Sequence, residues 1–341
     1  MKKDFDISII VCCYAGEETI EGCLNSLKCQ KRDNVSIEVL LIDDGSKDKT
    51  AKKILKFLEG NSTIDNLQFS YFRKENEGLS VARNYGISKS KSSIVAFIDE
   101  DAVADEYFAM NIIKLFNGNT NVNCIGGVIE LSNIDNFFAN IIQNSVFSFQ
   151  MKSEHGIIGT NMSFRKSLFA EVGGFQPEFT YRGDESAFFV KAKGTLEKLI
   201  SKNVIVKHLQ PPNFILWLKT RYENGYFSSA VLDLEKTKNI IRYKRLLFSL
   251  VTLFLPIITI CCFIYSSIVI LPISLLALYF LFILNRFFSA FNNYIKEYNR
   301  NAKGNILIAS YIIVIVFVGH IVEDYGDLKG FLKYRNYSWK K

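Results

Sequence analysis

Two aspartates separated by one residue, directly after an apolar run, are the residues of this chain best suited to chemistry. Residues 94–98 read Ile-Val-Ala-Phe-Ile, which is typical of a buried strand, and Asp99-Glu100-Asp101 follow at once. Because residues two apart in an extended chain point to the same side, Asp99 and Asp101 can share one divalent ion that also contacts phosphate oxygens. A solvated acidic loop is the alternative for this motif taken alone.

The elements around this motif predict a sheet whose carboxyl edge gathers further acids. Strand patterns alternate with helix patterns, with strands expected at 7–11, 37–42, 67–72 and 94–99. This alternation predicts a doubly wound parallel α/β sheet, which binds its ligands at the carboxyl ends of the strands. Asp43 and Asp44 end the second strand, so we expect them at the same edge as Asp99.

The usual glycine-rich phosphate loops are absent from the sequence. Neither G-x-G-x-x-G after the first strand nor G-x-x-x-x-G-K-[ST] occurs. A nucleotide bound at this edge would therefore be held by carboxylates on its base or ribose and by a metal ion on its phosphates.

Five segments in order resemble the family 2 glycosyltransferases of the GT-A fold, and the resemblance covers residues 5–210. They are I-S-I-I-V-C-C-Y at 7–14, L-L-I-D-D-G-S-K-D-K-T at 40–50, N-E-G-L-S-V-A-R-N-Y-G-I at 76–87, V-A-F-I-D-E-D at 95–101 and G-T-N-M-S-F-R-K-S-L-F-A-E-V-G-G-F at 159–175. The resemblance implies a Rossmann-like nucleotide-sugar domain.

The resemblance also implies donor-binding roles. Asp44 would contact the uracil or ribose of a nucleotide sugar, with Asp43 supporting it. Arg83 and Asn84 would face the diphosphate or the sugar, and Asp99 would lie against the donor as well as the metal.

Metal-binding and catalytic roles follow in the same way. Asp99 and Asp101 would form the D-x-D motif that holds Mn²⁺ or Mg²⁺. His208 follows the strand-like residues 204–206 and is either a surface histidine or a further metal ligand. Asp184-Glu185 stands where the family carries a Glu-Asp pair, so the order is reversed, and either carboxylate could be the general base. By position Glu185 takes the base's place.

The positive charge of the chain lies beside its apolar segments. Of the net +7, residues 1–245 contribute +2 (32 basic and 30 acidic residues), and residues 246–341 contribute +5 (9 basic and 4 acidic). This distribution suits a membrane surface better than a nucleic-acid groove, so we expect no nucleic-acid partner.

The C-terminal third predicts a membrane region, 236–341, after a catalytic domain at 1–235. Residues 246–285 carry no charge and are long enough for two crossings. We expect transmembrane helices at 246–264, 268–285 and 306–322 and an interfacial helix at 287–300. Five basic residues in 236–245 place the catalytic domain in the cytosol of an integral membrane protein, in a bacterial inner membrane.

The leading hypothesis is a metal-dependent inverting glycosyltransferase. It would move a sugar from a nucleotide donor, a UDP-sugar by preference, to a lipid-linked or polysaccharide acceptor at the cytosolic membrane face. Transfer to a polyprenyl phosphate is the alternative within enzymes. A non-catalytic scaffold that binds nucleotide sugars during polysaccharide assembly is the alternative from another class.

Overall fold

The chain forms two compact units. A computed structural model describes residues 5–144, 157–234, 239–265, 273–279, 281 and 306–334. One unit holds 1–134 and 153–210, and the other holds 135–152 and 211–341. The sequence predicts a domain boundary at residue 235. That boundary stays a prediction, because units defined by contacts need not be folding domains.

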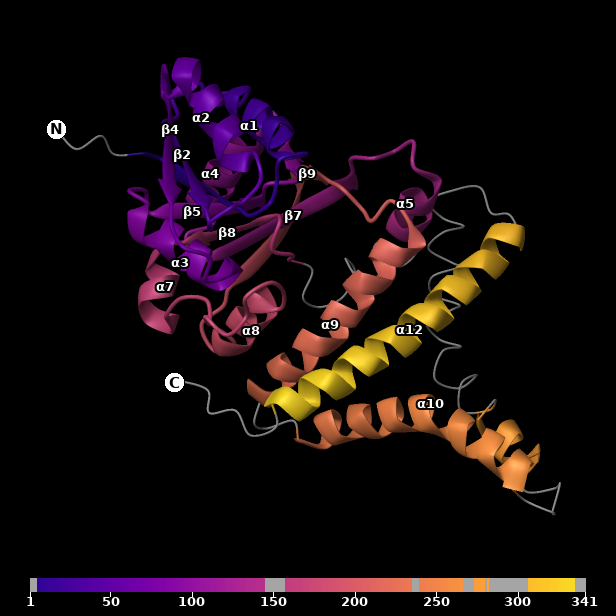
Figure 1. Ribbon diagram of the computed structural model, residues 1–341. Coiled ribbons are helices and arrows are strands. Elements are labelled where there is room, and N and C mark those ends of the chain that lie inside the picture. Colours follow the sequence, from indigo (N-terminus) through magenta and orange to yellow (C-terminus); the bar gives the residue numbers. More distant parts are fainter. Residues whose placement is uncertain are drawn as a thin grey trace. The chain divides into compact units, whose positions relative to one another are not determined.

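The first unit is built on a mixed sheet (Figure 1). Among the described residues its order is β3-β4-β2-β1-β5-β8-β7-β9-β6. The strands are β1 (Ile7–Cys13), β2 (Ile37–Asp43), β3 (Thr63–Ile64), β4 (Leu67–Arg73), β5 (Ile94–Asp99), β6 (Ala102–Ala104), β7 (Cys124–Leu131), β8 (Met162–Arg165) and β9 (Lys198–His208). Strands β4, β2, β1 and β5 are parallel, as the alternating pattern predicts.

The remainder of the sheet departs from the predicted parallel arrangement. Strand β8 is antiparallel to both β5 and β7, and β6 is antiparallel to β9. The sequence pattern that predicts crossovers ends at Asp101, so it carries no information on these later pairings. The α/β prediction is therefore confirmed, but the fully parallel sheet is wrong, because β3 is also antiparallel to β4 and only the pair β7–β9 beyond β5 is parallel.

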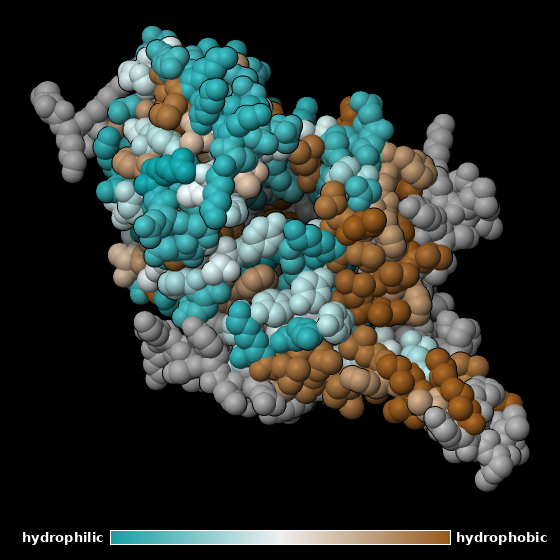
Figure 2. Space-filling view, in the orientation of Figure 1, coloured by the Kyte–Doolittle hydropathy of each residue, from teal (hydrophilic) through white to brown (hydrophobic). Residues whose placement is uncertain are grey.

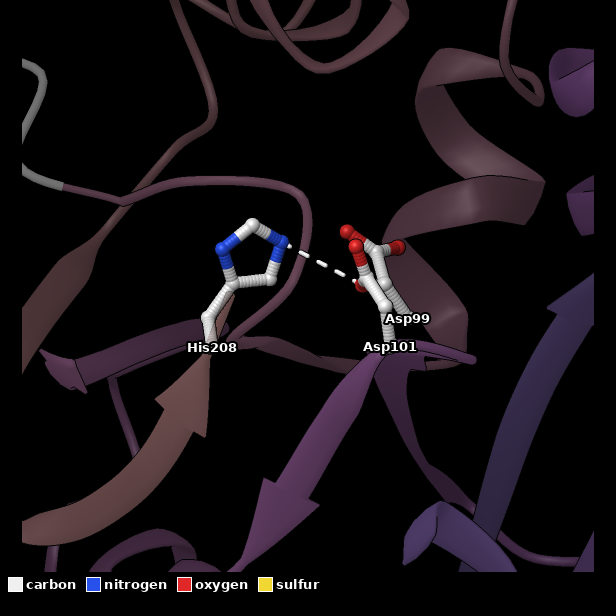
Figure 3. Close-up of side chains that lie close together, drawn as sticks. All are labelled: Asp99, Asp101 and His208. Carbon is white, nitrogen blue, oxygen red and sulfur yellow. Dashed lines mark ion pairs between the residues drawn. The ribbon is translucent and has the colours of Figure 1, made fainter. Parts of the chain in front are cut away.

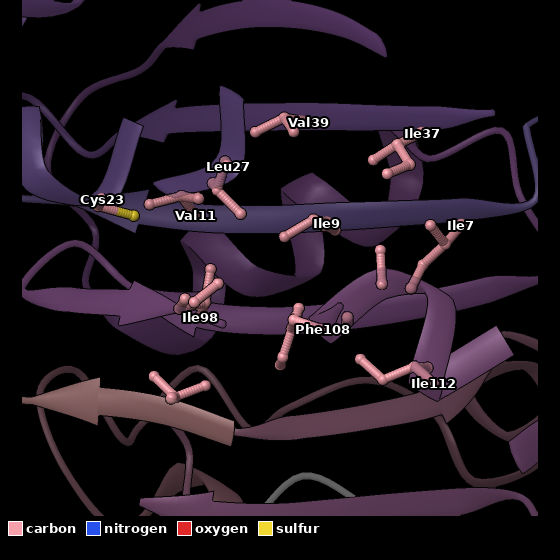
Figure 4. Close-up of a cluster of buried hydrophobic side chains, with 14 of the residues drawn as sticks. Ile7, Ile9, Val11, Cys23, Leu27, Ile37, Val39, Ile98, Phe108 and Ile112 are labelled. Carbon is pink, nitrogen blue, oxygen red and sulfur yellow. The ribbon is translucent and has the colours of Figure 1, made fainter. Parts of the chain in front are cut away.

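Helices cover both faces of the sheet. In this unit they are α1 (Ile20–Lys28), α2 (Thr50–Asn61), α3 (Leu79–Lys89), α4 (Phe108–Gly118), α7 (Ser167–Val172) and α8 (Asp184–Lys191). Ile9 of β1 packs in a cluster with Leu27 of α1 and Phe108 of α4 (Figure 4). The cluster also includes Ile54 of α2. Ile10 packs on the other side with residues of α3, α7 and α8. Burial of alternate residues on opposite faces explains why the central strands are apolar without a break.

The second unit is helical. Its helices are α5 (Phe137–Ile142), α9 (Phe214–Leu234), α10 (Asn239–Tyr265) and α12 (Ile306–Tyr334). Trp217 of α9 packs in a buried cluster with Phe138 of α5 and Ile315 of α12. On the face shown in Figure 2, brown surface gathers over these helices.

Glycines bring α9 and α12 into backbone contact. A Cβ atom at Gly225 would lie 2.0 Å from the carbonyl oxygen of Glu323, and one at Gly326 would lie 2.1 Å from that of Tyr222. At Gly330 the distance to the carbonyl oxygen of Tyr226 would be 2.1 Å. No side chain fits at these three positions, so the helices can approach this closely only because all three are glycine.

The predicted membrane region is corrected by the structure. Within the part of the chain that the structure describes, no helix has the length and apolar character needed to cross a membrane. Residues 306–322 belong to α12, which continues to Tyr334 and whose apolar Ile312 and Ile315 are covered by neighbouring side chains. This finding corrects the integral membrane assignment, because the described helices do not provide the crossings on which it rests.

The expected crossing at 246–264 is corrected as well, because it falls within α10, a described helix that contains Pro256. The crossing at 268–285 lies partly outside the described residues, and the interfacial helix at 287–300 lies wholly outside them.

Candidate active site

Three potential metal ligands meet at the carboxyl edge of the sheet. Asp99 ends β5, Asp101 directly precedes β6, and His208 ends β9, whose pairing with β6 places His208 opposite Ala102. One ligand atom from each of the three side chains lies within 4.8 Å of the other two. The Nε2 atom of His208 is 3.2 Å from Oδ1 of Asp101 (Figure 3). The structure thus brings together all three residues that the sequence offered as metal ligands.

The electrostatics of this group follow from its crowding. Burial raises the pKa of Asp99, and the charge of Asp101 adds to the rise while Arg83 opposes it. Burial alone would raise the pKa of Asp101, but the hydrogen bond and charge of His208 bring it below its ordinary value. Burial would lower the pKa of His208, but the hydrogen bond to Asp101 outweighs this and raises it. A cation among the three would relieve the repulsion between the two carboxylates.

The donor set fits a divalent ion. Two ligands of one ion at bonding distances of about 2.0–2.2 Å lie at most about 4.4 Å apart, so atoms that already lie within 4.8 Å of one another need to move little to hold one ion. Two carboxylates suit Mg²⁺ and Mn²⁺ alike, whereas the imidazole nitrogen favours a transition ion over Mg²⁺, which prefers oxygen ligands. The Nδ1 atom of His208 is buried and has no hydrogen-bond partner among the described residues.

Arg83 of α3 connects this group to the acidic pair. Only 2% of its surface is exposed, and its guanidinium lies 5.7 Å from the ring centre of Phe97 and 5.6 Å from that of Phe175. It forms an ion pair with Asp184 and a second, at 3.3 Å, with Asp99. The planar guanidinium, held between two rings, therefore bridges a potential metal ligand and the first residue of α8.

The two acids at the start of α8 have different surroundings. Asp184 is fully buried and its charge is balanced by Arg83. Glu185 is partly exposed, and burial together with the charge of Asp184 raises its pKa to about 8. A carboxylate with a raised pKa takes up a proton more readily near neutral pH, so Glu185 has the better properties of a general base.

The carboxylates of Asp43 and Asp44 form hydrogen bonds and ion pairs with other residues of the protein. The buried carboxylate of Asp43 accepts hydrogen bonds from the Tyr71 hydroxyl at 2.7 Å and the Ser46 amide at 2.8 Å. Asp44 accepts from the amide of Gly78 at 2.7 Å and pairs with Lys74 at 2.6 Å. Both acids lie at the expected sheet edge and hold the loops there, and a contact of Asp44 with the donor stays a prediction.

Asn84 has a structural partner as well. Its side-chain amide donates to the carbonyl oxygen of Phe175 at 2.7 Å, and its carbonyl oxygen accepts from the Phe175 amide at 2.8 Å. This pair of bonds fastens the segment at Phe175 to α3. A contact of Asn84 with the donor stays a prediction.

The sequence pattern gave no specific role to Glu100. Its carboxylate accepts a hydrogen bond from the backbone amide of Tyr14 at 2.7 Å. Burial raises its pKa to about 8, although the bond from Tyr14 opposes the rise. The one hint in the sequence was Gly16, because a glycine there leaves room for the Glu100 carboxylate beside the loop backbone.

The fold is a mixed α/β domain of the GT-A type, and one edge of its sheet carries a group of potential metal ligands. Residues 8–173 match the model of glycosyl transferase family 2. The comparison therefore confirms, for residues 8–173, the resemblance to glycosyltransferase family 2 that the sequence shows.

Several relatives carry glycosyltransferase names. Glycosyltransferase AglE of Haloferax volcanii is 30% identical over 182 residues, which are 52% of this chain and 58% of the relative. A glucosyl-dolichyl phosphate glucuronosyltransferase of the same organism is 24% identical over 190 residues, again 52% of this chain and 58% of the relative. The chain thus covers less than two thirds of the length of these relatives.

One solved structure shares the fold over nearly the whole chain. It is the mannosyltransferase PcManGT from Pyrobaculum calidifontis, described in complex with GDP-Man and Mn²⁺. The TM-score is 0.55 and the sequence identity 15%, over 98% of this chain and 88% of that one.

Proposed function

We propose that the protein is a metal-dependent, inverting glycosyltransferase. It would transfer a sugar from a nucleotide-sugar donor, a UDP-sugar by preference, to a hydroxyl group of a lipid-linked or polysaccharide acceptor. The observation that carries this proposal is the bridge made by Arg83 between Asp99 in the metal-ligand group and Asp184 beside Glu185. This bridge connects the residues that would bind the leaving group to the residue that would accept the proton of the acceptor hydroxyl.

The group of potential metal ligands would stabilise the leaving nucleoside diphosphate. Asp99, Asp101 and His208 would hold Mn²⁺, with Mg²⁺ as a weaker substitute. When bound, the ion acts as a Lewis acid that neutralises the charge developing on the nucleoside diphosphate. Arg83 pairs with Asp99 and Asp184 and lies against two aromatic rings, so it would hold the Asp99 carboxylate in place for the ion.

Glu185 would provide for the acceptor. As the acceptor oxygen forms its bond to the anomeric carbon, its proton passes to the Glu185 carboxylate, and the bond from that carbon to the phosphate oxygen breaks. The nucleoside diphosphate leaves with the electron pair of that bond. Attack from the side opposite the leaving group inverts the anomeric centre. Asp184 is unsuited to the proton transfer because it is fully buried and paired with Arg83.

The names of relatives support the class of donor and acceptor. The glucuronosyltransferase of Haloferax volcanii is named for a glucosyl-dolichyl phosphate, and a further relative from Staphylococcus aureus is a poly-β-1,6-N-acetyl-D-glucosamine synthase. The structural neighbour is described with GDP-Man and Mn²⁺. GDP-sugars therefore belong in any donor screen beside UDP-sugars.

The test is release of nucleotide by the purified full chain. UDP-, GDP- and dTDP-sugars would be supplied with Mn²⁺, with and without a membrane extract as acceptor source. We expect release from one donor, abolished by EDTA and by Asp99→Asn combined with Asp101→Asn. Absence of release from every donor, with nucleotide still bound tightly, would instead support the non-catalytic scaffold.

One variant distinguishes transfer to a polyprenyl phosphate, the second enzymatic candidate, from transfer to a hydroxyl group. A polyprenyl phosphate is already an anion and needs no base to remove a proton. Transfer to such an acceptor would therefore survive Glu185→Gln almost unchanged, whereas transfer to a hydroxyl would not.

A further inference from the structure

Glu100 joins the metal-ligand turn to the loop that follows β1. It stands between Asp99 and Asp101 in the sequence, but its carboxylate turns to the neighbouring strand, where Oε2 accepts the amide hydrogen of Tyr14 at 2.7 Å. Strand β1 is paired with β5 so that Cys12 lies opposite Asp99. The side chain thus reaches across the end of one strand to the loop beyond the next.

Gly16 shows how closely the carboxylate fits this loop. A Cβ atom at Gly16 would lie 2.6 Å from Cδ of Glu100 and 2.8 Å from its Oε2. The three atoms nearest to such a Cβ all belong to Glu100. The absence of a side chain at Gly16 therefore leaves the space in which the carboxylate lies.

Further bonds fix the rest of the loop from the other side. The amide of Ala15 donates to the Ser46 hydroxyl at 3.2 Å, and the amide of Glu17 donates to Asp48 at 3.1 Å. Ala15 itself has a φ of 58°, an uncommon conformation for a residue other than glycine, which needs support from its surroundings. Glu100 supplies that support from the β5 side.

The loop lies where a nucleotide would contact it. Strand β1 stands between β2 and β5 in the sheet, so the loop borders both Asp44 and Asp99. Tyr14 is 48% exposed at this edge. Ligands of open α/β sheets bind beyond the carboxyl ends of the strands, which is the position of this loop.

We propose that Glu100 is a positioning residue that couples the metal-ligand turn to the loop at Tyr14–Glu17. It would fix the position of this loop, which contacts the nucleotide, relative to the residues that hold the metal. This inference rests on the proposed function, because it presumes a nucleotide bound with a metal ion. Glu100 is not among the clustered potential metal ligands Asp99, Asp101 and His208, and its Oε2 atom accepts the Tyr14 amide. It acts through the backbone of Tyr14 instead.

The test compares nucleotide binding with metal binding in the full chain. We would measure the Kd of UDP and GDP at saturating Mn²⁺, the Kd of Mn²⁺ alone, and the thermal midpoint. Glu100→Ala is expected to weaken nucleotide binding about tenfold, as suits the loss of one charge-assisted hydrogen bond. Its Mn²⁺ affinity should remain that of the unmodified protein. Glu100→Gln keeps an acceptor oxygen for the Tyr14 amide and should restore binding.

A substitution at Gly16 tests the same coupling independently of Glu100. Gly16→Ala should weaken nucleotide binding by displacing the Glu100 carboxylate, and it should have little effect when Glu100 is already Ala, because nothing else lies as close. Glu21→Ala, which removes an exposed glutamate paired with Lys53, is the matched control and should change nothing. If Glu100→Ala fails to fold, Gly16→Ala alone carries the test.

Three results would overturn the inference. The first is a folded Glu100→Ala protein that binds nucleotide as the unmodified protein does. The second is loss of Mn²⁺ binding equal to that of Asp99→Asn, which would make Glu100 a metal ligand. The third is full additivity of Gly16→Ala and Glu100→Ala. Failure of the unmodified protein to bind either nucleotide with Mn²⁺ would be a different result, since it would overturn the proposed function itself.

Discussion

Arg83 and Asp184 form a buried ion pair in which 2% of the arginine and none of the aspartate is exposed. Burial would lower the pKa of Arg83, but the charges of Asp184 and Asp99 outweigh this and raise it, so the guanidinium stays charged. Two charges removed from water in this way depend on each other, because either one alone would be uncompensated.

The first prediction concerns this dependence. Arg83→Ala should lower the free energy of unfolding by about 3–5 kcal/mol, because Asp184 would be left buried without a partner. Adding Asp184→Asn should recover part of the loss, since the uncompensated charge is then removed. Chemical unfolding of the two variants checks this, and equal stability of both would contradict it.

The second prediction concerns the proton acceptor. Glu185→Gln should reduce kcat by about 10²–10⁴-fold with a hydroxyl acceptor, the usual contribution of a general base. Its nucleotide affinity should be unchanged. Glu171→Gln, a change at an exposed glutamate on α7, is the matched control. Retained turnover in Glu185→Gln would shift the role to another group or favour an anionic acceptor.

The third prediction concerns the pH dependence of turnover. A base must be ionised to accept a proton, and the pKa of Glu185 is raised to about 8. The rate should therefore rise with pH and level off above about 8. A pH–rate profile of kcat checks this, and a rising limb centred near the ordinary glutamate value would argue against Glu185.

The fourth prediction concerns stability at different pH values. The folded protein holds the Glu185 proton more tightly than the unfolded chain, because the pKa rises from 4.5 to about 8 on folding. The stabilising contribution is therefore complete below pH 4.5 and is lost as the pH rises through about 8. Thermal midpoints of Glu185→Gln should accordingly fall less between pH 5 and pH 8 than those of the unmodified protein. Parallel curves for the two proteins would contradict the shift.

The fifth prediction concerns the metal. His208→Ala should weaken Mn²⁺ binding by at least about tenfold and reduce the preference for Mn²⁺ over Mg²⁺, because the remaining donors are carboxylate oxygens. Titration with each ion checks this. His320→Ala, a change at a histidine of α12, is the control and should leave both affinities unaltered.

Much of the sheet was predictable because its central strands are apolar on both faces. The run 94–98 could be recognised as a strand, and the acids at its end could be placed at the ligand-binding edge, from residue types and order alone. The position of His208 beside Asp101 was offered only as one of two possibilities, since it depends on the pairing of β6 with β9.

Other features depend on contacts that a linear pattern does not contain. The proposal of Glu185 rather than Asp184 as the base rests on the ion pair of Asp184 with Arg83, which is 101 residues away in the chain. The apolar run 306–322 was mistaken for a membrane crossing because a helix covered by other helices and a helix covered by lipid have the same composition. In the structure Ile312 and Ile315 of α12 are buried, and no described helix has the character of a membrane crossing.

The glycines between α9 and α12 have a mechanical consequence. Gly225, Gly326 and Gly330 each receive a backbone carbonyl group of the opposite helix in a place where no side chain fits. A shift of one helix along the other by a single residue would bring side chains into these places. Packed helices elsewhere can slide past one another in small shear motions. These two are interlocked at three points, so we expect α9 and α12 to resist sliding along one another and to shift only as a pair.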